Sequence, residues 1–215
     1  MLEQSFYSIL SGVFHDVSQI LLIPVIIILL IFVIYAVISL GGLLFEYNNR
    51  RKTRTDFKEI ESIMLAIKNS KAPEKIIRMI KECKMPLHHK DIIIKLTETS
   101  DMDPEWREAF AQKILENEEF EAAKRLEKTE IIAKIGPAIG LMGTLIPLGP
   151  GLAALGAGDI QNLAQHLTVA FDAAILGMAS AALGFTISKL RRRWYEEDIS
   201  SLDTLAESVL EVLKS

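Results

Sequence analysis

The chain has 215 residues, half of them hydrophobic, and its mean hydropathy of +0.27 is too high for an average soluble domain. Its net charge of −4 gives no reason to expect nucleic-acid binding, and its single cysteine excludes an internal disulfide. Positive charge is absent from two long stretches, because residues 1–49 and 135–188 contain no Lys or Arg.

The first apolar run predicts a membrane helix over residues 17–45, after an extracytoplasmic N-terminus of residues 1–16. The run contains no charged residue and exceeds the roughly 20 residues needed to cross the hydrocarbon of a bilayer. A cleaved signal peptide is the competing interpretation. It is disfavoured because no basic region precedes the run and no small-residue cleavage site precedes Glu46. We therefore expect a retained membrane helix.

Residues 46–132 predict a helical cytoplasmic domain. The first helix is expected to continue beyond its span, because no proline or turn cluster occurs before Ser62. Short helices should follow, with Pro73 and Pro86 in their first turns, where the missing N–H is harmless. Asp103 is a typical N-cap residue for a further helix that continues into the second span.

Two further apolar runs predict spans over residues 133–158 and 164–189, joined by an extracytoplasmic loop at 159–163. An amphipathic cytoplasmic tail follows at 190–215. Basic clusters follow span one, precede span two and follow span three, so the positive-inside rule places the N-terminus outside and the C-terminus inside. These clusters are also expected to contact anionic lipid headgroups. The sequence predicts an all-α, multi-pass protein of the cytoplasmic membrane with three transmembrane helices.

Spans two and three carry small residues every three or four positions, whereas span one is rich in large aliphatic residues. Such stripes let helix backbones approach closely. We expect them to hold a homo-oligomer together, because one three-helix subunit should not bury them all; the alternative is packing without any transport role. The positions are Gly136, Gly140, Gly143 and Gly151 in span two, and Ala170, Ala174, Gly177, Ala181 and Gly184 in span three.

Polar groups within these spans are candidates for an ion path. Thr144 lies near the middle of span two, and its alternative role is a hydrogen bond to the preceding turn. Asp172 lies in span three, where a carboxylate costs about 2.5–3.5 kcal/mol and usually faces a partner or a water-filled path. Thr168 lies on the same helix face. The competing role of Asp172 is at the interface, reaching outward or capping a helix that begins late.

The sequence gives little support for a metal site, a phosphate-binding loop or a catalytic site. Cys83 with His88 and His89 fits no zinc-binding spacing. The acidic residues from Asp101 to Glu105 lack the glycine and the twelve-residue frame of an EF-hand. Span two lacks the Gly-Lys-Ser/Thr sequence of a phosphate loop, and no nucleophile–base pair is evident. We expect no metal, no cofactor and no enzymatic activity.

The segment from Gly136 to Leu145 resembles the MotA/TolQ/ExbB proton channel family, in which this helix carries Pro-x-x-Gly-Leu-x-Gly-Thr-Val/Leu. The segment from Leu167 to Gly177 is similar to the family's last helix, and the three-span layout is that of the TolQ/ExbB branch. The resemblance implies a pentameric ring around a dimer of a single-span partner such as ExbD, TolR or MotB. It further implies that Thr144 faces the ion path and that ion flow drives mechanical work or transport.

Two departures from the family pattern bear on conduction. The hydroxyl positions of the last helix fall on Ala173 and Ala174, beside Asp172, and Pro147 and Pro150 should bend span two. Either the aspartate takes over a polar role, or conduction is lost. The rival hypothesis is a non-conducting membrane scaffold that docks partners through its cytoplasmic helices. A small-solute transporter is disfavoured, because three spans without an inverted repeat provide no midplane binding site.

Overall fold

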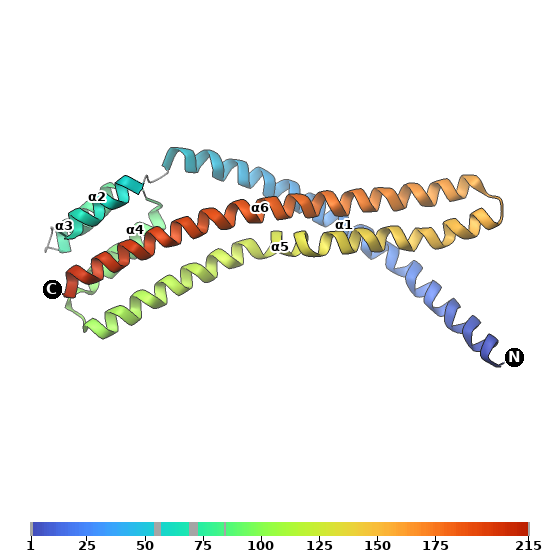
Figure 1. Ribbon diagram of the computed structural model, residues 1–215, viewed down its shortest axis with the longest axis horizontal. Coiled ribbons are helices and arrows are strands. Elements are labelled where there is room, and N and C mark those ends of the chain that lie inside the picture. Colours follow the sequence, from blue (N-terminus) through green and yellow to red (C-terminus); the bar gives the residue numbers. More distant parts are fainter. Residues whose placement is uncertain (1, 54–56, 69–72, 84, 215) are drawn as a thin grey trace. The chain divides into compact units, whose positions relative to one another are not determined.

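The computed structural model describes residues 2–53, 57–68, 73–83 and 85–214, and within these ranges the regular structure is entirely helical (Figure 1). The predicted all-α class is therefore confirmed. Among the described residues, three helices are long and apolar enough to cross a membrane, as predicted. In chain order the elements are α1 Leu2–Thr53, α2 Phe57–Lys68, α3 Pro73–Glu82, α4 Leu87–Thr97, the short 3-10 helix η1 Glu98–Asp101, α5 Pro104–Gly156 and α6 Ile160–Lys214.

The helix boundaries follow the proline and cap signals closely. α1 extends beyond the predicted span to Thr53; its expected continuation passes through residues 54–56, which lie outside the described residues. Pro73 is the first residue of α3, whereas Pro86 lies one position before α4, as its N-cap. The carbonyl of Asp103 accepts the N–H of Arg107, four residues later, at 3.0 Å, as the carbonyl of an N-cap residue does.

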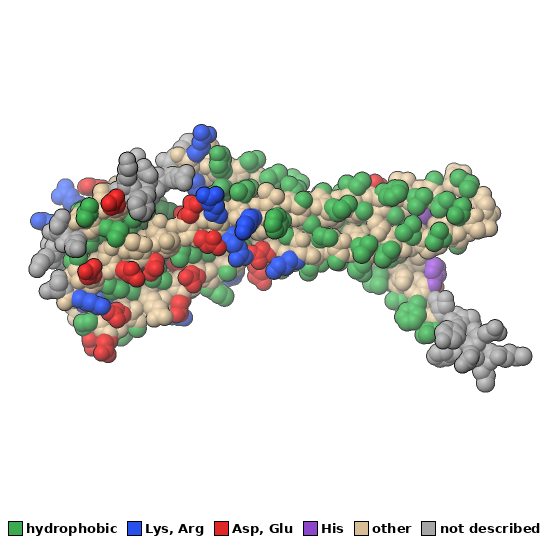
Figure 2. Space-filling model, viewed as in Figure 1, with side chains coloured by type: hydrophobic (Ala, Val, Ile, Leu, Met, Phe, Trp, Pro, Cys, Tyr) green, Lys and Arg blue, Asp and Glu red, His purple; other side chains and the backbone are tan. Residues whose placement is uncertain are grey.

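The chain forms two compact units. Unit 1 contains residues 1–42 and 127–189, and unit 2 contains residues 43–126 and 190–215. The three long helices each contribute to both units. Figure 2 shows mainly hydrophobic side chains over unit 1, whereas acidic and basic side chains gather over unit 2. This division of surface chemistry is the one expected for a membrane part and an aqueous part of one chain.

In unit 1, α5 and α6 lie side by side as an antiparallel hairpin (Figure 1). Gly158 makes the turn possible, because its φ of +76° is the left-handed conformation that other residues rarely adopt. Asp159 then caps α6, because its carboxylate accepts the N–H of Asn162 at 3.0 Å. Residues 160–163 of the predicted loop are therefore helical, and the turn is confined to residues 157–159.

α1 is the most exposed of the three apolar helices. Only 17% of its most apolar window is buried, against 28% for α5 and 33% for α6. Val25 and Leu29 are among its buried residues, and they pack against Ala173 of α6. The composition explains this difference, because large aliphatic side chains suit lipid, while small residues suit close helix contact.

Pro147 and Pro150 lie inside α5, which remains helical from Pro104 to Gly156. A proline has no N–H, so Pro150 leaves the carbonyl of Ile146 without its helical donor. Gln19 of α1 supplies one instead, because its Nε2 lies 3.4 Å from that carbonyl oxygen. A polar side chain in the apolar helix α1 thus compensates for a proline in α5.

Unit 2 has its own hydrophobic core. The amphipathic tail at the end of α6 contributes Leu202, Leu205 and Val209, all with an exposed fraction of at most 1%. The short helices complete this core with Ile67 of α2, Ile76 and Ile80 of α3, and Ile93 and Leu96 of α4.

Arg107, in the first turn of α5, links three segments of unit 2 through hydrogen bonds. Its side chain is buried, and its guanidinium donates to backbone carbonyls near the ends of other helical segments, where carbonyls lack helical partners. The acceptors lie 2.8–3.2 Å away and are the carbonyl oxygens of Thr99, Ser100, Met102 and Leu213. One side chain therefore ties the η1 segment to the end of α6.

We expect Arg107→Met to lower the free energy of unfolding of unit 2 by about 2 kcal/mol or more, because buried carbonyls would lose a charged donor. Denaturant titration of the full chain in mild detergent measures this change. The matched control is Arg78→Met: Arg78 pairs with Glu82 of the same helix, and the two side chains are 84% and 72% exposed. That control should change stability by less than about 1 kcal/mol. Equal effects of the two variants would contradict the role given to Arg107.

Candidate functional site

The contact between α5 and α6 brings two backbones together. A Cβ atom built at Gly177 would lie 2.6 Å from the Cα of Gly140 and 2.9 Å from the carbonyl oxygen of Gly136. At Gly184 it would lie 2.8 Å from the carbonyl oxygen of Thr129. These separations leave no room for a side chain, so the hairpin depends on glycine at both positions.

The structure places the predicted small residues along this contact. In span two, Gly143 faces Ala173 and Gly151 faces His166. In span three, the carbonyl oxygen of Ala174 lies 3.7 Å from the Cβ position of Gly140, and Ala170 and Ala181 are buried. Within one subunit all of these small residues are buried except Ala174, which stays partly exposed, so most of the stripe needs no second subunit for its burial. The three-residue turn brings the two stripes face to face, so each covers the other within a single chain.

The register of the hairpin sets Thr144 and Asp172 at one level. A Cβ at Gly143 would lie 2.6 Å from the Cβ of Ala173. Thr144 directly follows Gly143 in the chain, and Asp172 directly precedes Ala173. From Ile160 to Asp172, α6 advances about 18 Å. Asp172 therefore lies well inside the apolar hairpin. It does not cap a late-starting helix, because that role belongs to Asp159.

The candidate polar side chains lie on the surface of unit 1. Asp172 and Thr168 are exposed, and Thr144 is partly exposed. The two hydroxyl groups each donate to a carbonyl in the preceding turn, at 2.9 Å for Thr168 and 2.7 Å for Thr144. These local bonds use the hydroxyl hydrogen and leave oxygen lone pairs free to accept. An exposed carboxylate at this depth would face hydrocarbon unless a second surface or water covers it.

Pro147 adds a backbone carbonyl that was not among the predicted site residues. Because Pro147 has no N–H, the carbonyl of Gly143 lacks its helical donor. That carbonyl lies at the level of Thr144 and Asp172. The signal was present in the sequence, since a proline always affects the carbonyl four residues earlier. The level thus combines a carboxylate, a hydroxyl and a backbone carbonyl.

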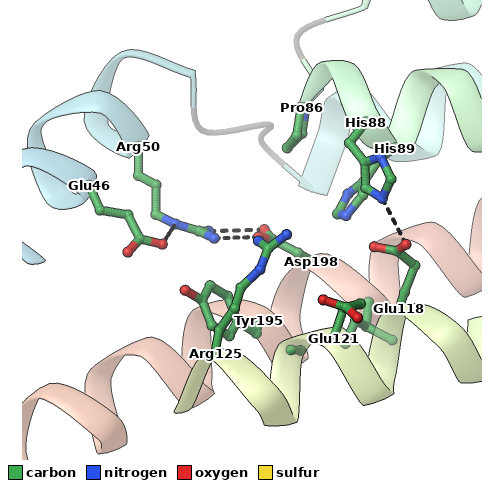
Figure 3. A pocket seen from close by; sticks show the side chains of 12 residues that line it. Glu46, Arg50, Pro86, His88, His89, Glu118, Glu121, Arg125, Tyr195 and Asp198 are labelled. Carbon is green, nitrogen blue, oxygen red and sulfur yellow. Dashed lines mark hydrogen bonds and ion pairs between the residues drawn. The ribbon is translucent and has the colours of Figure 1, made fainter. Parts of the chain in front are cut away.

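Unit 2 contains a charged cleft of about 170 Å³ between α1, α4, α5 and α6 (Figure 3). The guanidinium of Arg50 on α1 donates a hydrogen bond to each carboxylate oxygen of Asp198 on α6, and the Nη1–Oδ1 distance is 3.0 Å. Arg50 also pairs with Glu46 at 3.4 Å, and Arg191 donates to Glu46 at 3.1 Å. Burial alone would lower the pKa of Arg50, but Asp198 and Glu46 outweigh burial and raise it.

Two adjacent histidines of α4 face this cleft. The Nε2 atom of His88 lies 2.7 Å from a carboxylate oxygen of Glu118 on α5. Burial lowers the pKa of His89, although the charges of Asp198 and Glu118 act in the opposite direction. Burial also raises the pKa of Tyr195, which lines the cleft from α6. Their spacing in the sequence fits no zinc site, and no local pattern predicted the cleft that they line.

Comparison with known proteins identifies a family for this fold. A model of the MotA/TolQ/ExbB proton channel family matches residues 67–204, well over half of the chain. The match includes the α5–α6 hairpin and most of the charged cleft. No curated protein and no solved structure matches the chain at a significant level.

Proposed function

The chain belongs to the MotA/TolQ/ExbB proton channel family, and we propose that it is a ring subunit of an energy-transducing ion channel. The subunits form a homo-oligomer, a pentamer by resemblance, in the cytoplasmic membrane. Unit 2 lies in the cytoplasm, and the N-terminus lies outside. A single-span partner like ExbD, TolR or MotB occupies the ring and uses ion flow for mechanical work or transport.

The observation that carries this proposal is the position of Asp172. Its carboxylate is exposed on a single subunit, about 18 Å along α6 and level with Thr144. Leaving such a group in lipid costs about 2.5–3.5 kcal/mol. A ring with a central aqueous path removes this cost, because the polar level then faces the path. The oligomer is held by outward faces of the helices, since the small-residue stripes are used within each subunit.

The rival scaffold hypothesis rested on the missing hydroxyl groups at Ala173 and Ala174. Ala173 is 5% exposed and packs against Val25 and Leu29 of α1. A hydroxyl at this position would be buried between helices within the subunit. The absence of a hydroxyl at Ala173 therefore says little about conduction. Ala174 is partly exposed, so its missing hydroxyl remains an argument for the scaffold, whereas the polar level at Asp172 favours the channel. The gene neighbourhood offers an independent criterion, because a short single-span protein with an early intramembrane aspartate would favour the channel.

We expect Thr144→Val to lower ion flux severalfold without changing assembly, because valine keeps the shape but removes the hydroxyl from the path. Flux is measured in liposomes that contain the protein and its partner, and native mass spectrometry in mild detergent measures assembly. The matched control is Thr186→Val, an exposed threonine of α6 that also bonds to its preceding turn at 2.9 Å.

Full flux in Thr144→Val would remove this hydroxyl from the ion path. Monomers of the unmodified protein in the same native mass spectra would contradict the ring itself.

A further inference from the structure

We propose that the charged cleft of unit 2 is a regulatory proton site, in which protonation of His89 loosens α4 from α5 and α6. The inference goes beyond conduction, and it rests on the proposed function only for the side of the membrane that the cleft faces. In the proposed orientation, that side is the cytoplasm. The site would therefore sense the compartment into which the channel admits ions.

The charge balance of the cleft supports a proton site. Four carboxylates and two guanidinium groups line the cleft. Two of these carboxylates have further cationic partners, because Arg191 pairs with Glu46 at 3.1 Å and Lys124 pairs with Glu121 at 3.6 Å. The charges are therefore balanced when both histidines are neutral, and a proton on His89 adds a positive charge without a free counter-charge. The titratable and charged groups that face the cleft are Glu46 and Arg50 on α1, His88 and His89 on α4, Glu118, Glu121 and Arg125 on α5, and Tyr195 and Asp198 on α6.

His89 is the group whose protonation should disturb the packing, because the carboxylates of the cleft already have other partners. Arg50 already binds both oxygens of Asp198, and His88 contacts Glu118 at 2.7 Å. A proton on His89 would therefore create a half-buried cation whose nearest carboxylates are engaged. The His88 ring, with its centroid 6.2 Å away, would add repulsion if it were charged as well. Moving α4 outward lets water solvate the new charge.

The direction of the pH effect follows from the lowered pKa of His89, which burial causes. A histidine with a lowered pKa in the folded state favours the packed form when it is neutral. Its contribution is complete above the unfolded pKa of about 6.5 and is lost as the pH falls toward the lowered value. Acidification should therefore loosen α4.

A movement of α4 can be transmitted to the hairpin, because the two are connected along the chain. α4 ends at Thr97, the η1 segment follows directly, and α5 begins at Pro104. α5 then continues without a break into unit 1. A change in how α4 holds the start of α5 alters the restraint on the helix that carries Thr144. Ion entry would thereby be linked to the acidity that it produces.

Hydrogen–deuterium exchange of the full chain in lipid nanodiscs tests the inference without measuring ion flux. Exchange is compared at pH 7.5 and 5.5 after correction for intrinsic rates. We expect a severalfold loss of protection at the lower pH in α4 of the unmodified protein. His89→Gln should remove this dependence, because a neutral side chain cannot be charged. The control variant is His15→Gln, at an exposed histidine of α1, and it should behave like the parent.

Two results would overturn the proposal: equal protection of α4 at both pH values in the unmodified protein, or an unchanged pH dependence in His89→Gln. The first needs no variant, so it decides the question even if His89→Gln does not fold. A channel that conducts normally could give either result. Failure of the pH inference is therefore distinguishable from failure of the proposed function.

Discussion

Replacing Asp172 by Asn is expected to lower ion flux by about tenfold or more while leaving fold and assembly intact. The amide has nearly the same shape as the carboxylate, and the side chain is exposed on unit 1, so little packing within the subunit changes. An amide neither holds nor releases a proton under physiological conditions, and positioned proton-transfer groups contribute about a hundredfold or more to rates. Proton flux in liposomes with the partner present measures the effect.

The matched control for this experiment is Asp16→Asn. Asp16 is an exposed acidic residue of α1 that precedes its apolar run, and its replacement should leave flux unchanged. Equal flux in Asp172→Asn and the parent protein would make Asp172 a replaceable surface residue. That result would shift the interpretation toward the non-conducting scaffold.

Gly177→Leu is expected to destabilise the subunit by about 3 kcal/mol or more, because overpacking at a backbone contact cannot be relieved by rotating a side chain. The new Cβ would lie 2.6 Å from the Cα of Gly140. Gly149→Leu is the matched control, since a Cβ there meets nothing within 4 Å; we expect a change within about 0.5 kcal/mol. Denaturant titration in detergent gives both values.

The same pair of variants distinguishes two roles of the small residues. If the stripe held subunits together, Gly177→Leu would give a folded monomer of normal stability. The hairpin contact predicts instead that the subunit itself loses stability. A stable but dispersed Gly177→Leu protein would contradict the packing described for α5 and α6.

Much of this architecture could be predicted because hydropathy and charge are properties of short segments. A span needs only a sufficient run of apolar residues, so the run after Val17 predicts a membrane helix without knowledge of its neighbours. Helix starts are equally local, since Pro73 and Asp103 act through the backbone of their own turns. The stripes of Gly140 and Gly177 likewise predicted close helix contact, but they did not identify the partner surface.

Contacts between distant segments required the tertiary structure, because they depend on the register at which the chain returns. By itself the sequence determined three apolar helices, their small-residue faces and an acidic group at Asp172. Only the hairpin placed that group level with Thr144, through the contact of Gly143 with Ala173. The cleft is a similar case: Arg50 and Asp198 are separated by 148 positions. No local pattern specifies such a pair, since the packing of whole helices decides which side chains meet.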